Sequence, residues 1–442
     1  MTSRKTRVSE ENVLLEKAAK YLPGASTGNV YYKPEDALII KEGRGSRIYD
    51  YSGNEYIDYL LGSGPMLIGH AHPSVVAAVQ EVISRGSTYF TTSGAAIELA
   101  EEIVKAVPCA EKARFISSGS EATFYAMKAA RAFRKRDKIV KFEGAYHGTN
   151  DYAMMSVFTT EAKDYPVATA DSAGIPKALE GEVLICPYND IETTSAIIEE
   201  HHDEIGGVIV EPAQRVLMPK PGFLQGLREI TSHYQIPLIF DEVVSGFRWA
   251  YGGAQEYYGV TPDLASYGKA VGGGYPLSAV AGREEIMRVF DPAVSEEGSF
   301  VPGIGTLSGN PIAATAGLAT LRELKKPGTY DRLFATGNRI KSELARLLKE
   351  MEIPGVVTGE APCFDVYFGL DEVTDHRSTL KADGKMMERF NHNMLESGVL
   401  KGDHKFYIST VHSAEDVDRT VDAMAHALEQ AKGEASKYTF GT

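Results

Sequence analysis

From residue 97 onward, short apolar stretches alternate with longer segments of helical periodicity. The apolar stretches are typical of buried strands and cover residues 113–116, 138–142, 182–185, 207–210, 237–240, 264–266 and 278–281. Helices are predicted before the first strand at 97–107 and between later strands at 120–136, 192–202 and 223–234. Strands that alternate with helices imply a mainly parallel sheet with helices on both faces, the α/β class. Ligands of such sheets bind at the carboxyl ends of the strands, so functional residues are expected there.

The pattern changes after residue 311. Long helices at 312–324 and 329–351 precede predicted strands near 355–357, 364–368 and 406–409 and helices at 384–396 and 415–432. We therefore predict a large domain over residues 73–311 and a smaller α+β domain over residues 312–442. The N-terminal segment, residues 1–72, is too short for a core of its own and is expected to pack with the smaller domain. That segment contains a predicted helix at 10–21 and predicted strands at 37–40 and 47–50.

Composition excludes several classes of partner. The chain has 442 residues and a formal net charge of −14, whereas nucleic acids and anionic membranes are bound by basic surfaces. No apolar run is long enough to span a bilayer, and residues 1–20 lack the apolar region of a signal peptide. The three scattered cysteines fit a reducing compartment, so we expect a cytoplasmic protein. The pair His70 and His72 has no carboxylate in register, which favours structural histidines over a metal site.

One lysine, Lys269, lies among small and apolar residues just before three glycines, in the segment SYGKAVGGGYP at residues 266–276. Three consecutive glycines lose much backbone entropy on folding, so the chain is expected to turn sharply or to approach another group closely there. A lysine in a desolvated setting has a lowered pKa and can act as a nucleophilic amine. Lys269 is therefore the first candidate catalytic residue.

Residues that follow two of the predicted strands could hold a small molecule near this amine. Ser118 and Gly119 lead into the helix that is predicted to begin at Ser120, where free N–H groups bind phosphate. A serine that only caps the helix is the alternative explanation. Asp241 follows the strand at 237–240, so its carboxylate is expected either to face the ligand crevice or to cap the next turn.

Two loops add an aromatic ring and hydroxyl groups. Tyr146 could stack on a flat cofactor ring, or it could only pack against its own turn. The loop at residues 305–311, GTLSGNP, could donate to a phosphate or serve as a hinge. A phosphate cradle, an aromatic ring, a strand-end aspartate and a lysine beside glycines together fit pyridoxal 5'-phosphate (PLP). That cofactor needs a Schiff-base lysine and a carboxylate that keeps its pyridine nitrogen protonated, and its ring then serves as an electron sink.

These residues stand in a series of ordered motifs. The motifs are GHAHP (69–73), FISSGSEA (115–122), KFEGAYHG (141–148), FDEV (240–243), GGAQ (252–255), TPDL (261–264), GK (268–269) and GTLSGNP (305–311). From about residue 21 to its C-terminal helix, the chain resembles the class III, fold type I, PLP-dependent aminotransferases. Within that family it is most similar to the branch of glutamate-1-semialdehyde 2,1-aminomutase. The resemblance implies a fold type I architecture and PLP as the cofactor.

The resemblance also implies roles for individual residues. Lys269 would form the Schiff base and shuttle a proton, and Asp241 would pair with the pyridinium nitrogen. The other cofactor contacts that it implies are Ser118, Gly119, Ser120, Tyr146, His147, Glu211 and Val243. Thr306 would reach the phosphate of the neighbouring subunit, because the family builds its sites at a dimer interface. A homodimer with shared active sites is therefore expected.

The substrate side departs from the aminomutase branch. Aminomutases carry a carboxylate-binding arginine at the position occupied here by Tyr31, and a tryptophan at the position occupied by Ser63. Loss of a guanidinium removes a bidentate contact to a carboxylate, which counts against glutamate semialdehyde as the substrate. Arg215 is a candidate replacement, as are His404 and Lys405, although plain surface or interface charges explain all three equally well.

We therefore predict a PLP-dependent transaminase that moves an amino group from an amine or amino acid to a 2-oxo acid. Tyr31 and Ser63 suggest a pocket suited to an aromatic or bulky group. Three alternatives stay open: intramolecular amine transfer of the aminomutase type, an amino-acid racemase or epimerase on the same fold, and a metabolite-binding protein without catalysis. The presence of both Lys269 and Asp241 counts against the last.

Overall fold

The centre of the molecule is a seven-stranded sheet with the strand order β4-β10-β9-β8-β7-β5-β6. The computed structural model describes residues 6–28 and 36–438. The strands are β4 (Lys112–Ile116), β5 (Lys138–Phe142), β6 (Val183–Cys186), β7 (Ile205–Val210), β8 (Leu238–Asp241), β9 (Leu264–Tyr267) and β10 (Ser278–Gly282). Strands β6, β5, β7, β8 and β9 pair in parallel. The mainly parallel α/β sheet predicted from the sequence is confirmed.

Strand β10 is the exception, since it runs antiparallel between β9 and β4. Only residues 268–277 connect β9 to β10, and they contain a single 3-10 turn, Lys269–Gly272. A parallel neighbour needs a crossover of about a dozen residues or more, usually a helix, whereas an antiparallel neighbour needs only a short loop. The short connection that carries Lys269 therefore forces the chain to return antiparallel.

Alternate residues of the sheet strands pack into two separate cores, one on each face. Ile139, Ile209 and Ile239 pack with the alanine-rich side of α4 (Gly119–Arg134). Val140 and Phe240 pack on the opposite face, in the core that includes residues of α3, α5, α6 and α9. The bounds of these helices are α3 (Gly94–Ala106), α5 (Ile191–His201), α6 (Phe223–His233) and α9 (Pro311–Leu324). Strand β7 is buried at every position, as expected for a strand covered on both sides.

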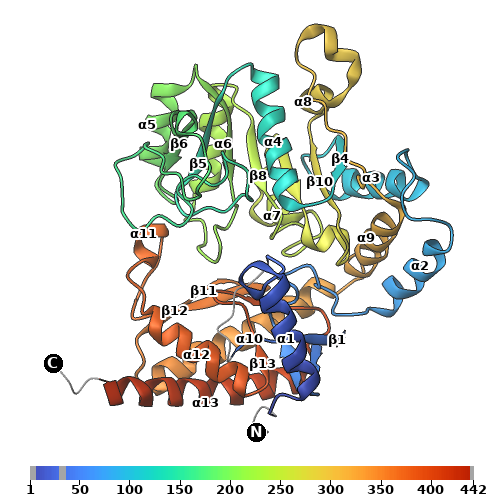
Figure 1. Ribbon diagram of the computed structural model, residues 1–442. Coiled ribbons are helices and arrows are strands. Elements are labelled where there is room, and N and C mark those ends of the chain that lie inside the picture. Colours follow the sequence, from blue (N-terminus) through green and yellow to red (C-terminus); the bar gives the residue numbers. More distant parts are fainter. Residues whose placement is uncertain (1–5, 29–35, 439–442) are drawn as a thin grey trace.

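A second, smaller unit lies below the large sheet in Figure 1. Its three-stranded antiparallel sheet has the order β11-β12-β14. Its elements are α10 (Thr329–Glu350), β11 (Gly355–Glu360), β12 (Cys363–Phe368), α11 (His376–Thr379), α12 (Gly384–Glu396), β13 (Val399–Leu400), β14 (Phe406–Tyr407) and α13 (Ala414–Tyr438). Although α10 and α13 have 22 and 25 residues, no helix in the described part of the chain is both long and apolar enough to cross a membrane.

The N-terminal elements join this smaller unit through a four-stranded sheet of order β1-β2-β3-β13. They are α1 (Ser9–Tyr21), β1 (Ile40–Arg44), β2 (Arg47–Asp50) and β3 (Glu55–Asp58). Strand β3 pairs in parallel with β13, and the Arg47 guanidinium forms a 2.9 Å ion pair with Asp416 at the start of α13. The strand predicted at 37–40 is instead β1 at residues 40–44. Those residues are largely exposed and show no apolar alternation, so the hydrophobic pattern did not indicate their strand. Neither β3 nor the two-residue β13 was predicted.

Helix α9 follows the domain boundary predicted at residue 311, yet it packs against α2 (Pro73–Ile83), α3 and the Lys269–Gly272 turn. All three of these segments precede residue 311. We therefore propose that the boundary between the two units lies near residue 325 rather than at 311. The asparagine and proline at the start of α9 mark a helix N-terminus, which by itself does not require a change of domain.

Candidate active site

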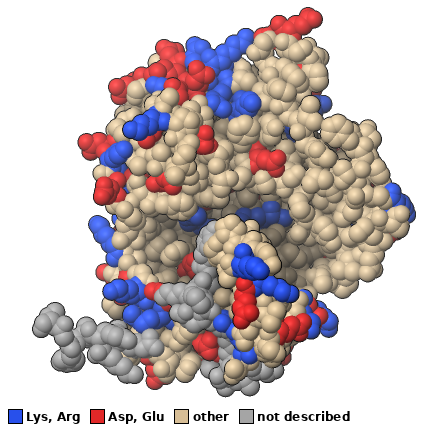
Figure 2. Space-filling model, in the orientation of Figure 1, with Lys and Arg blue, Asp and Glu red and all other residues tan. Residues whose placement is uncertain are grey.

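A cavity of about 500 Å³ opens at the carboxyl ends of the parallel strands, where the large sheet faces the smaller unit. Figure 2 shows the molecule hollowed across its middle, with lysine or arginine side chains exposed inside the hollow. Ten of the predicted site residues line the cavity: Ser63, Gly119, Ser120, Tyr146, His147, Glu211, Arg215, Asp241, Val243 and Lys269. The size falls within the range of small-molecule sites, and the position is that expected for a parallel sheet.

Three predicted residues are not part of this lining. Ser118 caps α4: its hydroxyl accepts from the Glu121 N–H at 3.3 Å and donates to the Glu121 carboxylate at 3.0 Å. Thr306 is exposed and lies outside the cavity of its own chain. Tyr31 lies outside the described residues.

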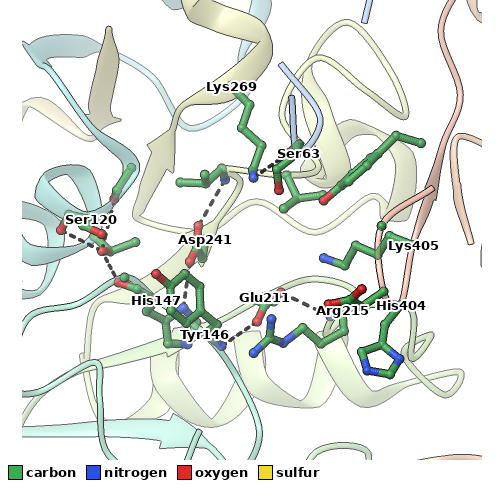
Figure 3. Close-up of a pocket in the computed structure, with 18 of the residues that line it drawn as sticks. Ser63, Ser120, Tyr146, His147, Glu211, Arg215, Asp241, Lys269, His404 and Lys405 are labelled. Carbon is green, nitrogen blue, oxygen red and sulfur yellow. Dashed lines mark hydrogen bonds and ion pairs between the residues drawn. The ribbon is translucent and has the colours of Figure 1, made fainter. Parts of the chain in front are cut away.

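Lys269 begins the short turn after β9, and its backbone adopts the left-handed region with φ of 48°. Its amine donates a 2.7 Å hydrogen bond to the carbonyl of Ser63 and faces the cavity (Figure 3). Burial lowers the pKa of Lys269. The nearby cations Lys405 and Arg248 lower it further, against an opposing effect of Tyr407. A lowered pKa increases the neutral fraction of the amine, which is the nucleophilic form.

The glycines after Lys269 allow α9 to approach. Gly273 has φ of 57°, and a Cβ on it would lie 2.5 Å from the Thr320 hydroxyl and 2.7 Å from the Ala316 carbonyl, both on α9. No side chain fits at such distances. The glycine run therefore positions the Lys269 turn against a helix.

Asp241, the last residue of β8, extends its carboxylate into the cavity and is held on both oxygens. One oxygen accepts from the Ser266 hydroxyl and the Val243 N–H, both at 3.1 Å. The other lies 2.7 Å from Nδ1 of His147, a fully buried ring. This network fixes the direction of the carboxylate, so Asp241 can present a charged acceptor to a protonated ring nitrogen.

The N-terminus of α4 forms another wall of the cavity, with Gly119 and Ser120 facing inward. Space is tight there. A Cβ on Gly119 would lie 2.9 Å from Val243, and a Cβ on Gly148 would lie 2.5 Å from the Ser120 hydroxyl. The Thr149 N–H donates to the same hydroxyl at 3.2 Å. Free N–H groups at the positive end of a 16-residue helix suit a phosphate.

Tyr146, Glu211 and Arg215 form the wall below Asp241 in Figure 3. The Glu211 carboxylate accepts from the Tyr146 N–H at 2.9 Å and from the Arg215 N–H at 3.2 Å. The Arg215 guanidinium lies 5.4 Å from the centre of the Tyr146 ring. Glu211 thus fixes the backbone at Tyr146 and at Arg215. Tyr146 itself is 39% exposed beside the cavity.

Lys141 is a further functional candidate, for which the sequence motif alone predicted no role. Lys141, on β5, is fully buried, and its ammonium donates to the carbonyls of Ala145, Ala153 and Met155, at 3.1 Å and 2.9 Å for the first two. Burial lowers the pKa of Lys141 to about 7, against opposing effects of Asp171 and Glu211. A lysine between the apolar residues Val140 and Phe142 of the predicted strand was the signal that could have marked it.

The two histidines near residue 70 have structural contacts. Nε2 of His70 lies 2.7 Å from the Asp58 carboxylate, and Nδ1 of His72 accepts from the Ser74 N–H at the start of α2. Within residues 6–28 and 36–438, no group of three or more His, Cys, Asp or Glu side chains is arranged to hold a metal ion.

The residues present fit PLP. A nucleophilic amine, a fixed carboxylate and a helix N-terminus without room for a Cβ at Gly119 face one cavity, and an aromatic ring lies at its edge. These groups match the aldehyde, the ring nitrogen, the phosphate and the flat ring of that cofactor.

Comparison with known proteins agrees with this fit. The model of the family described as aminotransferase class-III matches residues 30–428. The chain belongs to the class III aminotransferase family. Its cofactor is therefore PLP, and the fold type I architecture inferred from the motifs is confirmed.

Named relatives within the family fall into two groups. Two proteins named glutamate-1-semialdehyde 2,1-aminomutase, from Methanothermobacter thermautotrophicus and Methanosphaera stadtmanae, are 41% and 39% identical over 96% of this chain and 99% of their own length. A solved omega-transaminase from Sphaerobacter thermophilus is 36% identical, with a TM-score of 0.92 over 96% of this chain and 98% of that chain. A solved transaminase with PLP bound is 29% identical, with a TM-score of 0.89 over 98% of this chain and all of that one. The resemblance to the aminomutase branch is thus confirmed.

Proposed function

We propose that the protein is a PLP-dependent transaminase, which moves an amino group from an amine or amino acid to a 2-oxo acid. The observation that carries the proposal is that Lys269, Asp241 and the N-terminus of α4 face one cavity. In this proposal Lys269 holds the cofactor and moves a proton at the carbon that bears the amino group. Asp241 keeps a proton on the ring nitrogen, and Gly119 and Ser120 bind the phosphate through α4. PLP, when bound, supplies the electron sink.

The remaining contacts follow from the same arrangement. Tyr146 and Val243 would lie against the two faces of the ring, and His147 would support Asp241 through their 2.7 Å contact. Glu211 would hold Tyr146 in place through its N–H. Because Thr306 lies outside the cavity of its own chain, we propose that it serves the site of a second subunit in a homodimer.

The substrate side supports transfer between two molecules. Ser63 lines the cavity beside Lys269, at a position where aminomutases carry a tryptophan, and the smaller side chain leaves room for an exchangeable donor and acceptor. Arg215 lines the opposite wall and is our candidate for a substrate-binding cation. The 36% identical solved structure named as an omega-transaminase supports the same reaction type.

The test is a half-reaction assay. Purified holoenzyme is mixed with one amine at a time, and the absorbance band of bound PLP is followed without any oxo acid. A transaminase loses the band with a suitable donor and regains it when a separate 2-oxo acid is added. If no amine in a broad panel changes the band, the transaminase proposal fails.

A second candidate is intramolecular transfer of the aminomutase type, and it is favoured by the curated relatives, which are 39–41% identical over nearly the whole chain. The two candidates differ in their need for a second molecule. An aminomutase converts glutamate 1-semialdehyde to completion with no added amine or oxo acid, whereas a transaminase stops after one turnover per site. Sustained conversion of that compound alone would therefore select the second candidate.

A further inference from the structure

The cavity contains a lysine that makes no polar contact with the protein. Lys405 lines the cavity and is half-buried. Within residues 6–28 and 36–438, its ammonium forms no hydrogen bond or ion pair, and it lies 5.8 Å from the centre of the Tyr407 ring. Burial lowers the pKa of Lys405, but Tyr407 and Glu211 oppose this and the pKa is raised. The amine therefore stays charged while its N–H groups have no protein acceptor, and an anion in the cavity would supply one.

The backbone around Lys405 is well anchored. The Gly402 N–H donates to the Lys405 carbonyl at 3.1 Å, which closes a tight turn between β13 and β14. The next two residues, Phe406 and Tyr407, form β14, which pairs with β12 in the smaller unit. The side chain therefore projects from a fixed strand end, so its ammonium is available for a ligand at little conformational cost.

The other cations of the cavity already have partners or face elsewhere. The Lys269 amine donates to the Ser63 carbonyl at 2.7 Å. Arg215 Nε donates to the Gly144 carbonyl at 3.4 Å, and its guanidinium lies over the Tyr146 ring. His404 turns its ring away from the cavity centre, whereas the Lys405 amine points into it (Figure 3). Lys405 is thus the cation best placed to meet a bound anion.

Its position also separates this anion site from the phosphate site. Ser120 and the N-terminus of α4 lie at one end of the view in Figure 3 and Lys405 lies at the other, with Lys269 and Asp241 between them. A cofactor whose phosphate occupies the α4 end cannot also supply the anion at Lys405. That second anion must belong to the substrate that meets the Lys269 side of the cavity.

We propose that Lys405 binds the substrate carboxylate, which the 2-oxo acid acceptor carries, and that the same contact favours amino acids over simple amines as donors. This inference rests on the proposed amino-group transfer. In this proposal Lys405, from the smaller unit, takes the place of the carboxylate-binding arginine of aminomutases. Arg215, from the large unit, lines the cavity beside Lys405. The ammonium binds a carboxylate as a point charge, which tolerates several carboxylate orientations better than a guanidinium fork does.

The test compares holoenzymes of the natural sequence, Lys405→Met and Lys405→Arg. Lys385→Met, on an exposed lysine of α12 outside the cavity, is the matched control. The donors are matched pairs that differ only by a carboxylate: 3-aminobutanoate with isopropylamine, and alanine with ethylamine. Lys405→Met should lower kcat/KM for the amino acids by roughly 10- to 100-fold, mainly through KM, because a hydrogen-bonded charge contact is lost. The half-reaction with the matched amines, followed by loss of the PLP absorbance band without any oxo acid, should change by less than about 3-fold. Lys405→Arg should keep most of the amino-acid activity.

A second readout does not depend on turnover. Butanoate, which has a carboxylate but no amine, should bind the natural holoenzyme in a calorimetric titration and bind Lys405→Met more weakly by a similar factor. If Lys405→Met loses its cofactor, Lys405→Gln replaces it in both assays. An equal loss for amino acids and amines, or unchanged butanoate binding, overturns the role of Lys405. If the natural holoenzyme reacts with no amine at all, the proposed function fails, while the butanoate titration still decides the carboxylate site.

Discussion

The amine of Lys269 donates its 2.7 Å hydrogen bond to the main-chain carbonyl of Ser63, which lies 206 residues earlier in the chain. Ser63 belongs to a loop in which Leu61, Gly62, Ser63 and Gly64 all have positive φ, between 49° and 106°. Within the described residues no carboxylate forms an ion pair with Lys269. The reactive amine is thus held by a strained backbone loop, and because it has no acidic partner its lowered pKa is preserved.

Lys269→Ala should abolish covalent attachment of PLP and lower kcat by at least about 1,000-fold, because both the attachment point and the proton carrier are lost. The measurement is mass spectrometry after borohydride reduction, which should find PLP on peptide 266–276 of the natural protein and not of the variant. Lys385→Ala serves as the control and should change neither result. Full activity in Lys269→Ala would rule out Lys269 as the catalytic amine.

Arg248 should influence Lys269 through this loop. Arg248 is fully buried, donates to the Gly64 carbonyl through Nη2, and is among the cations that lower the pKa of Lys269. Arg248→Met should therefore raise the pKa of Lys269 and shift the pH midpoint of PLP uptake by the apoenzyme to higher pH. Stopped-flow measurements of PLP uptake between pH 6 and 10 give that midpoint.

Gly64→Ala is the companion variant, because it disturbs the loop without removing the charge. Its Cβ would lie 3.1 Å from Nη2 of Arg248 at a residue with φ of 106°, so PLP uptake should slow while its pH midpoint stays close to that of the natural protein. An unchanged midpoint in Arg248→Met would show that the charge of Arg248 does not reach Lys269.

Lys141→Met should lower the thermal midpoint by several degrees and weaken PLP binding. The change leaves the carbonyls of Ala145, Ala153 and Met155 without their buried donor, at a cost of roughly 1–3 kcal/mol for each unsatisfied group, partly offset by removal of a buried charge. The loop that carries Tyr146 and His147 starts at Ala145, so its displacement should reach the cofactor. Differential scanning calorimetry and a PLP titration test both parts, with the exposed Lys385→Met as control. If Lys141→Met binds PLP as tightly as the natural protein does, Lys141 contributes to folding stability and not to cofactor binding.

His412 should make the protein acid-sensitive. The ring is buried, stacks on Tyr59 at 4.3 Å and accepts from the Ser409 N–H at 3.0 Å, and burial lowers the pKa of His412 to about 4 against opposing effects of Asp416 and Asp58. The unfolded chain binds a proton near pH 6.5 and the folded chain does so only near pH 4. The stability that His412 contributes is therefore complete above pH 6.5 and is lost as the pH falls toward 4. The full effect is about 3 kcal/mol.

Thermal unfolding midpoints at half-unit steps from pH 4 to 7 measure this dependence. His412→Asn, which keeps a hydrogen-bond acceptor but does not titrate, should show a shallower decline over the same window. Parallel curves for the two proteins would mean that other groups control the acid sensitivity.

Much of the fold and the cofactor site could be predicted because their signals are local. Ser266 to Pro276 surround Lys269 with small residues, and Asp241 directly follows a buried apolar strand. Residues such as Ser118 and Ser120 could not be told apart in this way, since both are serines at a helix start. Only the direction of each side chain shows that one caps α4 and the other faces the cavity.

By itself, the sequence determined the α/β class, the family and its cofactor, and it singled out Lys269 and Asp241 as candidates, because strand alternation and contiguous motifs do not depend on distant contacts. Tertiary structure decided which cations face the cavity, how Ser63 meets Lys269, and that β10 returns antiparallel. Lys405 and Arg215 lie 190 residues apart in sequence and on different units, and their shared cavity arises only when the smaller unit packs against the large sheet. The shared position of these two charges depends on that packing, because nothing in the sequence marks them as neighbours.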